Sequence, residues 1–406
     1  MTALNPADRS VSSARPQGAA SGRSARLVSV DVFRGLMVAG MILVTNAGSW
    51  DFVYWPLKHA EWNGVTPTDM IFPSFLFIVG VSMSLSFAAR FKRGESRMHL
   101  LVHVVERSVL LILLGLFLNG FPLFDWHDLR IPGVLQRIGL CYLIAGLVYL
   151  ATVRQRQADG GVRFRMNAFA MIAVVVVLLV GYWSLMKLVP VPGYGAGRLD
   201  AAGNLGAYID RSLMGTNHLW FWGGQQWDPE GLLSTLPATV NLMFGILVGE
   251  WIRGVRNHGK RLLWMAVAGA ALVIAGVALN PLIPINKKIW TDSFVLFSGG
   301  VSLLALALLH WLIDLRGWRR GLTPALIFGT NAVLGFALAN MINPIFGLVG
   351  RHDASGKLTP VNGLAFEVFS RFLNPWNASL AYALVFVLLT MVILWPLYRR
   401  GIFVRL

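Results

Sequence analysis

The chain has 406 residues, of which 56% are hydrophobic and only 13% are charged. A soluble domain carries roughly 25% charged residues, so this composition excludes an ordinary soluble enzyme. It predicts an all-α polytopic membrane protein, because helices satisfy their backbone hydrogen bonds internally within a bilayer.

The N-terminal segment differs from the rest of the chain. Residues 1–28 are rich in Ser, Ala, Gly and Arg and contain no apolar run. They lack the short apolar core of a cleavable signal peptide, so we expect a disordered cytoplasmic tail. Residues 29–406 are then one transmembrane domain. Cys141 is the only cysteine, which excludes an intrachain disulfide.

Apolar runs follow one another along the remaining sequence. Residues 70–89, 169–186, 262–279 and 378–398 contain no Asp, Glu, Lys or Arg. A helix needs ~20 residues to cross the hydrocarbon core, and each of these runs is close to that length. We predict ten spans, beginning near Val32, Met70, Ser108, Val134, Asn167, Leu232, Leu262, Thr291, Leu322 and Ala378.

The distribution of basic residues predicts the orientation. Of the 35 Lys and Arg, 23 lie in the N-terminal tail and in segments 90–107, 153–166, 253–261, 314–320 and 399–405. Ten lie in the connections of the other side. Cytoplasmic loops carry the excess, so both termini are expected in the cytoplasm. This bias accounts for most of the net charge of +16, and we therefore expect no nucleic-acid binding.

The first predicted span has a polar residue near each end. Asp31 and Arg34 lie three residues apart at its inner start. They form either a local ion pair beside the helix N-terminus or, through Arg34, a contact to an anionic cofactor. Asn46 lies at the outer end. Polar groups at such positions are costly in a membrane and indicate function.

The outer connection after this span contains the most informative segment, KHAEWNG at 58–64. His59 stands there beside a lysine, and histidine is the side chain best suited to proton transfer near neutral pH. Trp62 follows within the same segment. Asp69 opens the second span and acts either as a cap of that helix or in the chemistry.

The fourth span enters from the same outer side through RIPGVLQR at 130–137. Gln136 and Arg137 are expected just inside the membrane, where an arginine should face the bundle and meet a partner. That partner is Asp69 or Asp128 in a structural role, and a substrate in a functional one.

Later polar features are weaker. Trp220, Trp227 and nearby Gln residues could stack on a sugar, but from composition alone we favour an aromatic belt at the membrane interface. Lys287 and Asn331 lie at helix edges. The sequence shows no metal-ligand cluster, phosphate-binding glycine loop, serine nucleophile motif or internal repeat.

The chain resembles the heparan-α-glucosaminide N-acetyltransferase family and its bacterial NagX-type relatives. The resemblance rests on several dispersed segments in the same order, from about residue 26 onward. They are SVDVFRG (29–35), KHAEWNG (58–64), DMIFP (69–73), RIPGVLQRIG (130–139), DPEGL (228–232) and PINK (284–287).

The resemblance implies a transmembrane acyltransferase that carries an acetyl group from cytosolic acetyl-CoA to a glucosamine amine on the far side. It implies His59 and Asn46 as catalytic residues, and with it we expect Arg34 and Asn331 to contact the acetyl-CoA. The expected sugar contacts are Trp62, Asp69, Arg130, Gln136, Arg137 and Lys287. Expected partners are acetyl-CoA, an amino sugar or its oligosaccharide and the lipid bilayer, with a homodimer as one assembly and no metal. The short tail departs from the lysosomal members, which carry a large luminal N-terminal domain.

Two further interpretations remain open at this point. The chain could transport amino sugars, or it could O-acetylate envelope glycans. We expect a multi-pass protein of a bacterial inner membrane with His59 facing the periplasm. Whether His59 acts as a base or forms an acetyl-imidazole is open as well.

Overall fold

The computed structural model describes residues 27–158, 161–255, 257–352 and 358–404. Of the predicted N-terminal tail, only Leu27 and Val28 fall within these ranges, and Val28 already begins the first helix. The rest of the tail lies outside the described residues.

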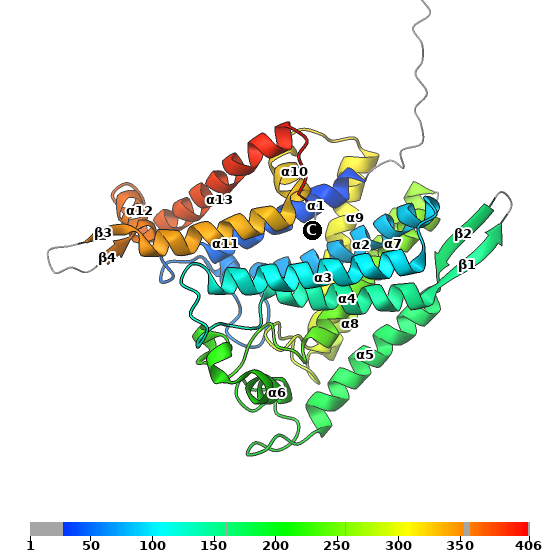
Figure 1. Cartoon of the computed structure of the whole chain (residues 1–406), viewed down its shortest axis with the longest axis horizontal. Helices are drawn as coiled ribbons and strands as arrows, with labels where there is room; N and C mark the ends of the chain where they lie inside the picture. The colour runs from blue at the N-terminus through cyan, green and yellow to red at the C-terminus, as the bar shows by residue number, and fades with distance from the viewer. Residues whose placement is uncertain (1–26, 159–160, 256, 353–357, 405–406) are drawn as a thin grey trace, which may run out of the picture.

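Helices long and apolar enough to cross a bilayer dominate the described residues, which confirms the predicted all-α polytopic fold (Figure 1). There are nine: α1 (Val28–Thr45), α2 with its first turn η2 (Pro67–Met70, then Ile71–Lys92), α3 (Arg97–Gly120), α4 (Val134–Thr152), α5 (Ala168–Leu188), α7 (Thr235–Gly254), α8 (His258–Leu279), α9 with its π-helical end η5 (Asp292–Leu309, then His310–Leu315) and α13 (Pro375–Arg399).

The ninth predicted span, which begins near Leu322, is a broken one. Helices α10 (Thr323–Thr330) and α11 (Ala332–Leu348) meet at Asn331 with a bend of 88°. Counted as one span, the pair brings the number among the described residues to ten, as the sequence predicts.

Short elements occupy connections that the sequence suggested were loops. They are η1 (Trp55–Leu57), β1 (Val153–Ala158), β2 (Gly161–Met166), α6 (Leu205–Met214), η3 (Thr216–His218), η4 (Phe221–Gly223), β3 (Gly350–His352), β4 (Leu358–Pro360) and α12 (Val361–Ser370). Each strand pair is an antiparallel hairpin. The two hairpins lie at opposite ends of the bundle (Figure 1).

The start of α3 differs most from its prediction, since it lies at Arg97 rather than near Ser108. The hydroxyl of Ser96 accepts a hydrogen bond from the backbone N–H of His99 and caps the helix there. A capped N-terminus stabilises a first turn even where hydropathy is low. Helix α3 therefore begins with polar turns that precede its apolar part.

Glycines let the central helices approach closely. A Cβ on Gly80 of α2 would lie 1.9 Å from the carbonyl oxygen of Leu242, and one on Gly245 of α7 equally close to that of Phe77. Gly35 of α1 faces the carbonyl oxygen of Ala325 in α10 in the same way. Small residues at such crossings are typical of packing in membranes, where tight backbone contact replaces the hydrophobic effect.

The start of α1 and the segment after α13 both contact the α10–α11 break at one end of the bundle. Arg34, near the start of α1, donates to the carbonyl oxygen of Gly329 at 2.6 Å. Asn331 donates to the carbonyl oxygen of Ile402 and accepts from the N–H of Val404, which follow α13. The loop that carries His59 joins the other end of α1 to α2, so it lies at the opposite end of the bundle.

Candidate active site

Asp69 organises the entry into α2. Its Oδ2 accepts hydrogen bonds from the N–H of Thr66 at 3.0 Å, the hydroxyl of Thr66 at 3.1 Å and the N–H of Ala60 at 3.1 Å. This is a capping box, in which the first acid of the turn satisfies the unpaired donors at a helix start. The predicted capping role of Asp69 is therefore confirmed, and it uses only one carboxylate oxygen.

The other oxygen of Asp69 contacts His59. Its Oδ1 lies 2.6 Å from Nδ1 of His59. A carboxylate only accepts hydrogen bonds, so this contact holds the imidazole proton on Nδ1 and leaves the lone pair on Nε2. The side chain of His59 is 45% exposed, whereas that of Asp69 is only 2% exposed. A buried acid thus orients a histidine whose other nitrogen is accessible.

Lys287 completes this group from a distant part of the chain. Its Nζ lies 3.2 Å from Nδ1 of His59 and 3.7 Å from Oδ1 of Asp69. Since Nδ1 already donates to the carboxylate, Lys287 acts on the pair through its charge. Partial burial and the Lys287 ammonium lower the pKa of His59, while Asp69 opposes them. The imidazole is therefore neutral near pH 7 and can accept a proton.

Backbone pairing places Lys287 beside His59. The N–H of Gly64 donates to the carbonyl oxygen of Ile285 at 2.7 Å. The side-chain NH2 of Asn286 donates to the side-chain oxygen of Asn63 at 3.1 Å. These bonds join the two segments 58–64 and 284–287. Both segments carry the family resemblance in the sequence, and the structure brings them into contact.

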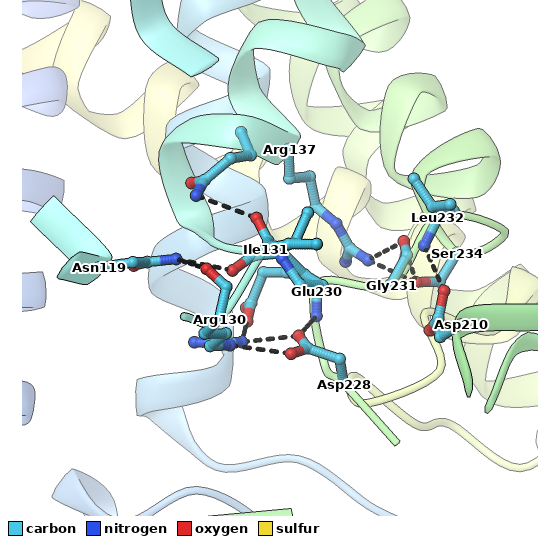
Figure 2. Close-up of polar contacts among 12 residues, drawn as sticks. Asn119, Arg130, Ile131, Arg137, Asp210, Asp228, Glu230, Gly231, Leu232 and Ser234 are labelled. Carbon is cyan, nitrogen blue, oxygen red and sulfur yellow. Dashed lines mark hydrogen bonds and ion pairs between the residues drawn. The ribbon is translucent and has the colours of Figure 1, made fainter. Parts of the chain in front are cut away.

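A second polar cluster surrounds the entry to α4 (Figure 2). Arg130 donates two hydrogen bonds to the carboxylate of Asp228, at 2.8 and 2.6 Å, and one to Glu230 at 2.6 Å. Bidentate arginine–carboxylate pairs fix both partners in position. Burial would raise the pKa of Glu230, but Arg130, Arg137 and Lys287 together lower it. Glu230 is thus an anion in the same electrostatic environment as His59.

Arg137 is more buried than Arg130, and its guanidinium points toward Gly231 and Ser234 (Figure 2). Within the described residues its partners are the carbonyl oxygen of Gly231, at 2.9 Å, and the hydroxyl of Ser234. The predicted pairing with Asp69 or Asp128 is therefore wrong, because the loop before α7 folds under the guanidinium. Its Nε and Nη1 are buried without a hydrogen-bond partner, and the group lies 5.1 Å from the ring centre of Trp290.

The loop 228–231 is also held from α6. The carboxylate of Asp210 accepts a hydrogen bond from the N–H of Leu232 at 2.9 Å. Burial raises the pKa of Asp210 to about 7. The prediction from sequence missed Asp210, Asp228 and Glu230 as site residues, although the last two stand in the DPEGL segment. An acid directly before an apolar span was the signal that could have identified them.

Trp62 belongs to an aromatic cluster beside the histidine loop. Its indole N–H donates to the carbonyl oxygen of Leu199, and its ring meets that of Trp227 edge to face at 5.1 Å. Trp220 packs on Trp227 in the same manner, and Lys288 lies over both rings. These rings are thus part of a defined cluster, whereas neighbouring Trp222 is 82% exposed and suits an interfacial belt.

Two predicted site residues use their side-chain amides to bind backbone carbonyl groups close to them in sequence. Asn46 is buried and its Nδ2 donates to the carbonyl oxygen of Ile42 at 2.7 Å, while its Oδ1 is buried without a partner. Gln136 donates to the carbonyl oxygen of Ile131 at 3.1 Å and packs against Gly115. In the described geometry neither hydrogen-bonds to His59, so their predicted roles remain predictions.

The two residues expected to contact acetyl-CoA lie together at the opposite end of the bundle. Arg34 pairs with Asp31 at 2.8 Å and binds Gly329, two residues before Asn331. The local ion pair expected from the sequence is therefore present. Asn331 is fully buried and clamps the segment after α13. Both side chains hold the α10–α11 break in place, and their contact with a cofactor stays a prediction.

Comparison with known proteins shows one family. The family model described as heparan-alpha-glucosaminide N-acetyltransferase, catalytic, matches residues 26–190. The heparan-alpha-glucosaminide N-acetyltransferase of Mus musculus is 32% identical over 350 residues, and that of Homo sapiens is 31% identical over 349 residues. Each alignment covers 76% of this chain and 52% of the relative. The chain thus spans about half the length of the curated relatives it matches.

Proposed function

The chain belongs to the heparan-α-glucosaminide N-acetyltransferase family, and on that premise we propose that it is an acetyl-CoA-dependent acetyltransferase. It would take the acetyl group from acetyl-CoA at the basic end of the bundle and transfer it to the amine of a glucosamine-type sugar at the end that carries His59. The observation that carries this proposal is the 2.6 Å contact between His59 and Asp69, which leaves Nε2 free as a base.

The chemistry follows from the tautomer. The neutral amine attacks the thioester carbonyl and a C–N bond forms, while Nε2 of His59 takes the proton that the amine loses. The tetrahedral intermediate then expels the sulfur of CoA, and His59 returns its proton to the departing thiolate. Positioned base catalysis of this kind contributes about 10²–10⁴-fold. Asp69 stabilises the transient imidazolium and keeps the ring in place, as carboxylates do in other histidine-based sites.

Negative charge on the carbonyl oxygen needs a donor. Asn46 and Arg137 are the candidates, since Arg137 has two buried N–H groups without a partner. Losing one donor of this type costs about 10²–10³-fold in kcat. Asn46 would have to release the carbonyl oxygen of Ile42 to serve, whereas Arg137 would use its existing free groups. Direct transfer is favoured over an acetyl-imidazole because it needs no reactive intermediate near water.

The acceptor would lie among the charged and aromatic groups around His59. Glu230 can receive the ammonium of an incoming amino sugar before deprotonation, and Lys287 can bind sugar hydroxyls. The rings of Trp62 and Trp227 offer apolar faces of the kind on which sugar rings stack. This arrangement supports an amino sugar over a neutral one.

The donor would enter from the other end. CoA carries several phosphates and is confined to the cytosol, so its head belongs at the basic face and its thin arm must pass between the helices. Together with the Lys and Arg bias, this leads us to propose that both termini are cytoplasmic. The resemblance to bacterial NagX-type relatives leads us to propose a bacterial inner membrane. The break at Asn331 is filled by Ile402 and Val404, which supports a closed structural break over the open midplane site of a transporter.

Purified protein in liposomes tests the proposal. Acetyl-CoA is supplied on the side of the termini and glucosamine on the other, and N-acetylglucosamine is measured. We expect product from the wild-type protein and at least about 10²-fold less from His59→Ala. Uptake of unmodified glucosamine without product would refute the enzyme in favour of a transporter. Acetylation of sugar hydroxyls alone would identify an O-acetyltransferase.

The orientation has its own test. A cysteine at Ala60 in a Cys141→Ala background should react with an impermeant thiol reagent added from the periplasmic side. The Ala60 side chain is partly exposed, and its backbone N–H keeps the bond to Asp69 after substitution. Labelling only from the cytoplasmic side would overturn the proposed orientation.

A further inference from the structure

An apolar pocket lies directly beside the histidine loop. It is enclosed by the outer end of α1, the segment that follows it and the start of α13, and it holds about 270 Å³ of space including its open mouth. Its walls include Ala47, Leu57, Leu380 and Ala383. None of the lining residues is charged.

Both hydroxyl groups of the lining are already hydrogen-bonded. The hydroxyl of Tyr54 donates to the side chain of Asn377 at 2.8 Å. The hydroxyl of Ser379 donates to the carbonyl oxygen of Ser49 at 3.0 Å and accepts from its N–H. A sugar ring needs free donors and acceptors, so this pocket does not suit one. The pocket is partly open to solvent, so its enclosed space is smaller than 270 Å³ and does not surround a whole ligand. An alkyl chain has no polar groups to satisfy and can lie along the apolar walls.

Two residues of the pocket wall lie close in sequence to the proposed catalytic residues. Ala47 directly follows Asn46, and Leu57 is separated from His59 only by Lys58. The wall of the pocket and the catalytic loop are thus the same piece of chain. A chain held in the pocket would have its head group beside the loop that carries His59.

A cation stands at the mouth. The ammonium of Lys58 lies 5.7 Å from the ring centre of Trp376, which lines the pocket. None of the ion pairs found among the described residues involves Lys58, and its side chain is exposed. A positive group without a carboxylate partner at the rim of an apolar pocket is complementary to an amphiphile with an anionic head.

We propose that the pocket holds the hydrocarbon chain of a membrane-anchored acceptor, an amino sugar joined to a lipid through a phosphate. The chain would lie against Leu380 and Ala383, the phosphate at Lys58 and the amine at His59. A long acyl group on the donor fits less well, because it carries no charge for Lys58. The inference rests on the proposed acetyl transfer and names its substrate class.

The first test compares acceptors in proteoliposomes supplied with acetyl-CoA. The acceptors are glucosamine, a decyl glucosaminide without phosphate and glucosamine 1-phosphate esterified with a decyl chain. Wild-type protein should show the highest kcat/KM for the phosphate ester. Leu380→Trp, which fills the pocket, should raise KM for the two decyl acceptors by at least about tenfold, since burying each methylene is worth about a fourfold factor in affinity.

Matched variants separate the chain from the phosphate. Val385→Trp adds the same ring to the exposed side of α13, where Val385 is 49% exposed. It should leave KM unchanged for both decyl acceptors. Lys58→Gln should raise KM for the phosphate ester about threefold to tenfold and leave that of the decyl glucosaminide unchanged. Equal kcat/KM for glucosamine and the ester in wild-type protein, or equal loss for all acceptors in Leu380→Trp, would overturn the inference.

A binding measurement keeps the inference testable if no acceptor is acetylated. A dansyl-labelled decyl phosphate ester of glucosamine is titrated into the detergent-solubilised full chain and displaced by unlabelled ester. Leu380→Trp should weaken binding at least about tenfold, and Val385→Trp should not. Absence of product with intact binding would refute the acetyl transfer alone. Displacement by phosphatidylglycerol as effective as by the ester would identify a general lipid groove and refute the inference.

Discussion

Replacing Asp69 by asparagine should disable His59 through its tautomer. The Oδ2 atom of Asp69 receives three donors, two from Thr66 and one from Ala60. An asparagine must place its single carbonyl oxygen there, because its NH2 group cannot accept those bonds. The NH2 group then faces Nδ1 of His59, 2.6 Å from the original oxygen, and forces that nitrogen to become an acceptor.

The magnitude follows from this switch. With Nδ1 as acceptor, the imidazole proton moves to Nε2 and the nitrogen that faces the acceptor no longer has a free lone pair. The whole general-base contribution is then lost, so kcat should fall by about 10²–10⁴-fold. In a serine protease, changing the carboxylate partner of the catalytic histidine to an amide lowers kcat about 10⁴-fold for the same reason. The KM for acetyl-CoA should change little, because the donor does not contact Asp69 in this mechanism.

The assay is the initial rate of acetyl transfer to glucosamine in proteoliposomes, measured across pH. A tautomer fault is not repaired by changing pH, so the loss should persist at every pH tested. Thr66→Ala is the matched control, since it removes one donor to Oδ2 and leaves the contact between Asp69 and His59. It should lower the free energy of unfolding by about 1 kcal/mol and keep most of kcat. Activity of Asp69→Asn within threefold of wild type, or its recovery at another pH, would refute the reasoning.

Three further predictions concern the same site. Lys287 lowers the pKa of His59, so Lys287→Met should raise that pKa and shift the acidic limb of the kcat/KM profile to higher pH. Glu230 acts in the opposite sense, and Glu230→Gln should shift the same limb to lower pH, which a pH–rate profile also measures. Asn46→Ala should lower kcat by about 10²-fold with a smaller effect on the dissociation constant of acetyl-CoA, measured by calorimetry. Equal loss of both quantities would assign Asn46 to donor binding.

The sequence predicted the membrane architecture well because its signal is local. An apolar run of sufficient length must be helical in a bilayer, so the span starts could be read from composition. The exceptions are local too. The start of α3 was misplaced because Ser96 caps polar turns that hydropathy ignores, and the sharp bend at Asn331 leaves no mark in the apolar pattern.

The site was only partly predictable because its contacts are long-range. His59 and Asp69 were both selected, but nothing in their spacing of ten residues shows that one carboxylate oxygen caps a helix while the other holds the imidazole. Lys287 reaches His59 across 228 residues, and Arg130 reaches Asp228 across 98. Such pairs depend on which helices are neighbours in space. Charge alone suggested that Asp69 or Asp128 pairs with Arg137. In the folded chain the hydrogen-bond partners of Arg137 are instead Gly231 and Ser234.

The opposite charges on either side of His59 suit a base that must return its proton. A histidine paired with a carboxylate alone would hold a proton strongly and would slow its transfer to the departing sulfur. Partial burial and Lys287, 3.2 Å away, offset that attraction and keep the pKa of the imidazole below its usual value. The general base and the general acid are the same group in this reaction, and such a group works best when neither protonation state is strongly favoured. Asp69 therefore fixes the direction of the imidazole, while Lys287 limits how long it stays charged.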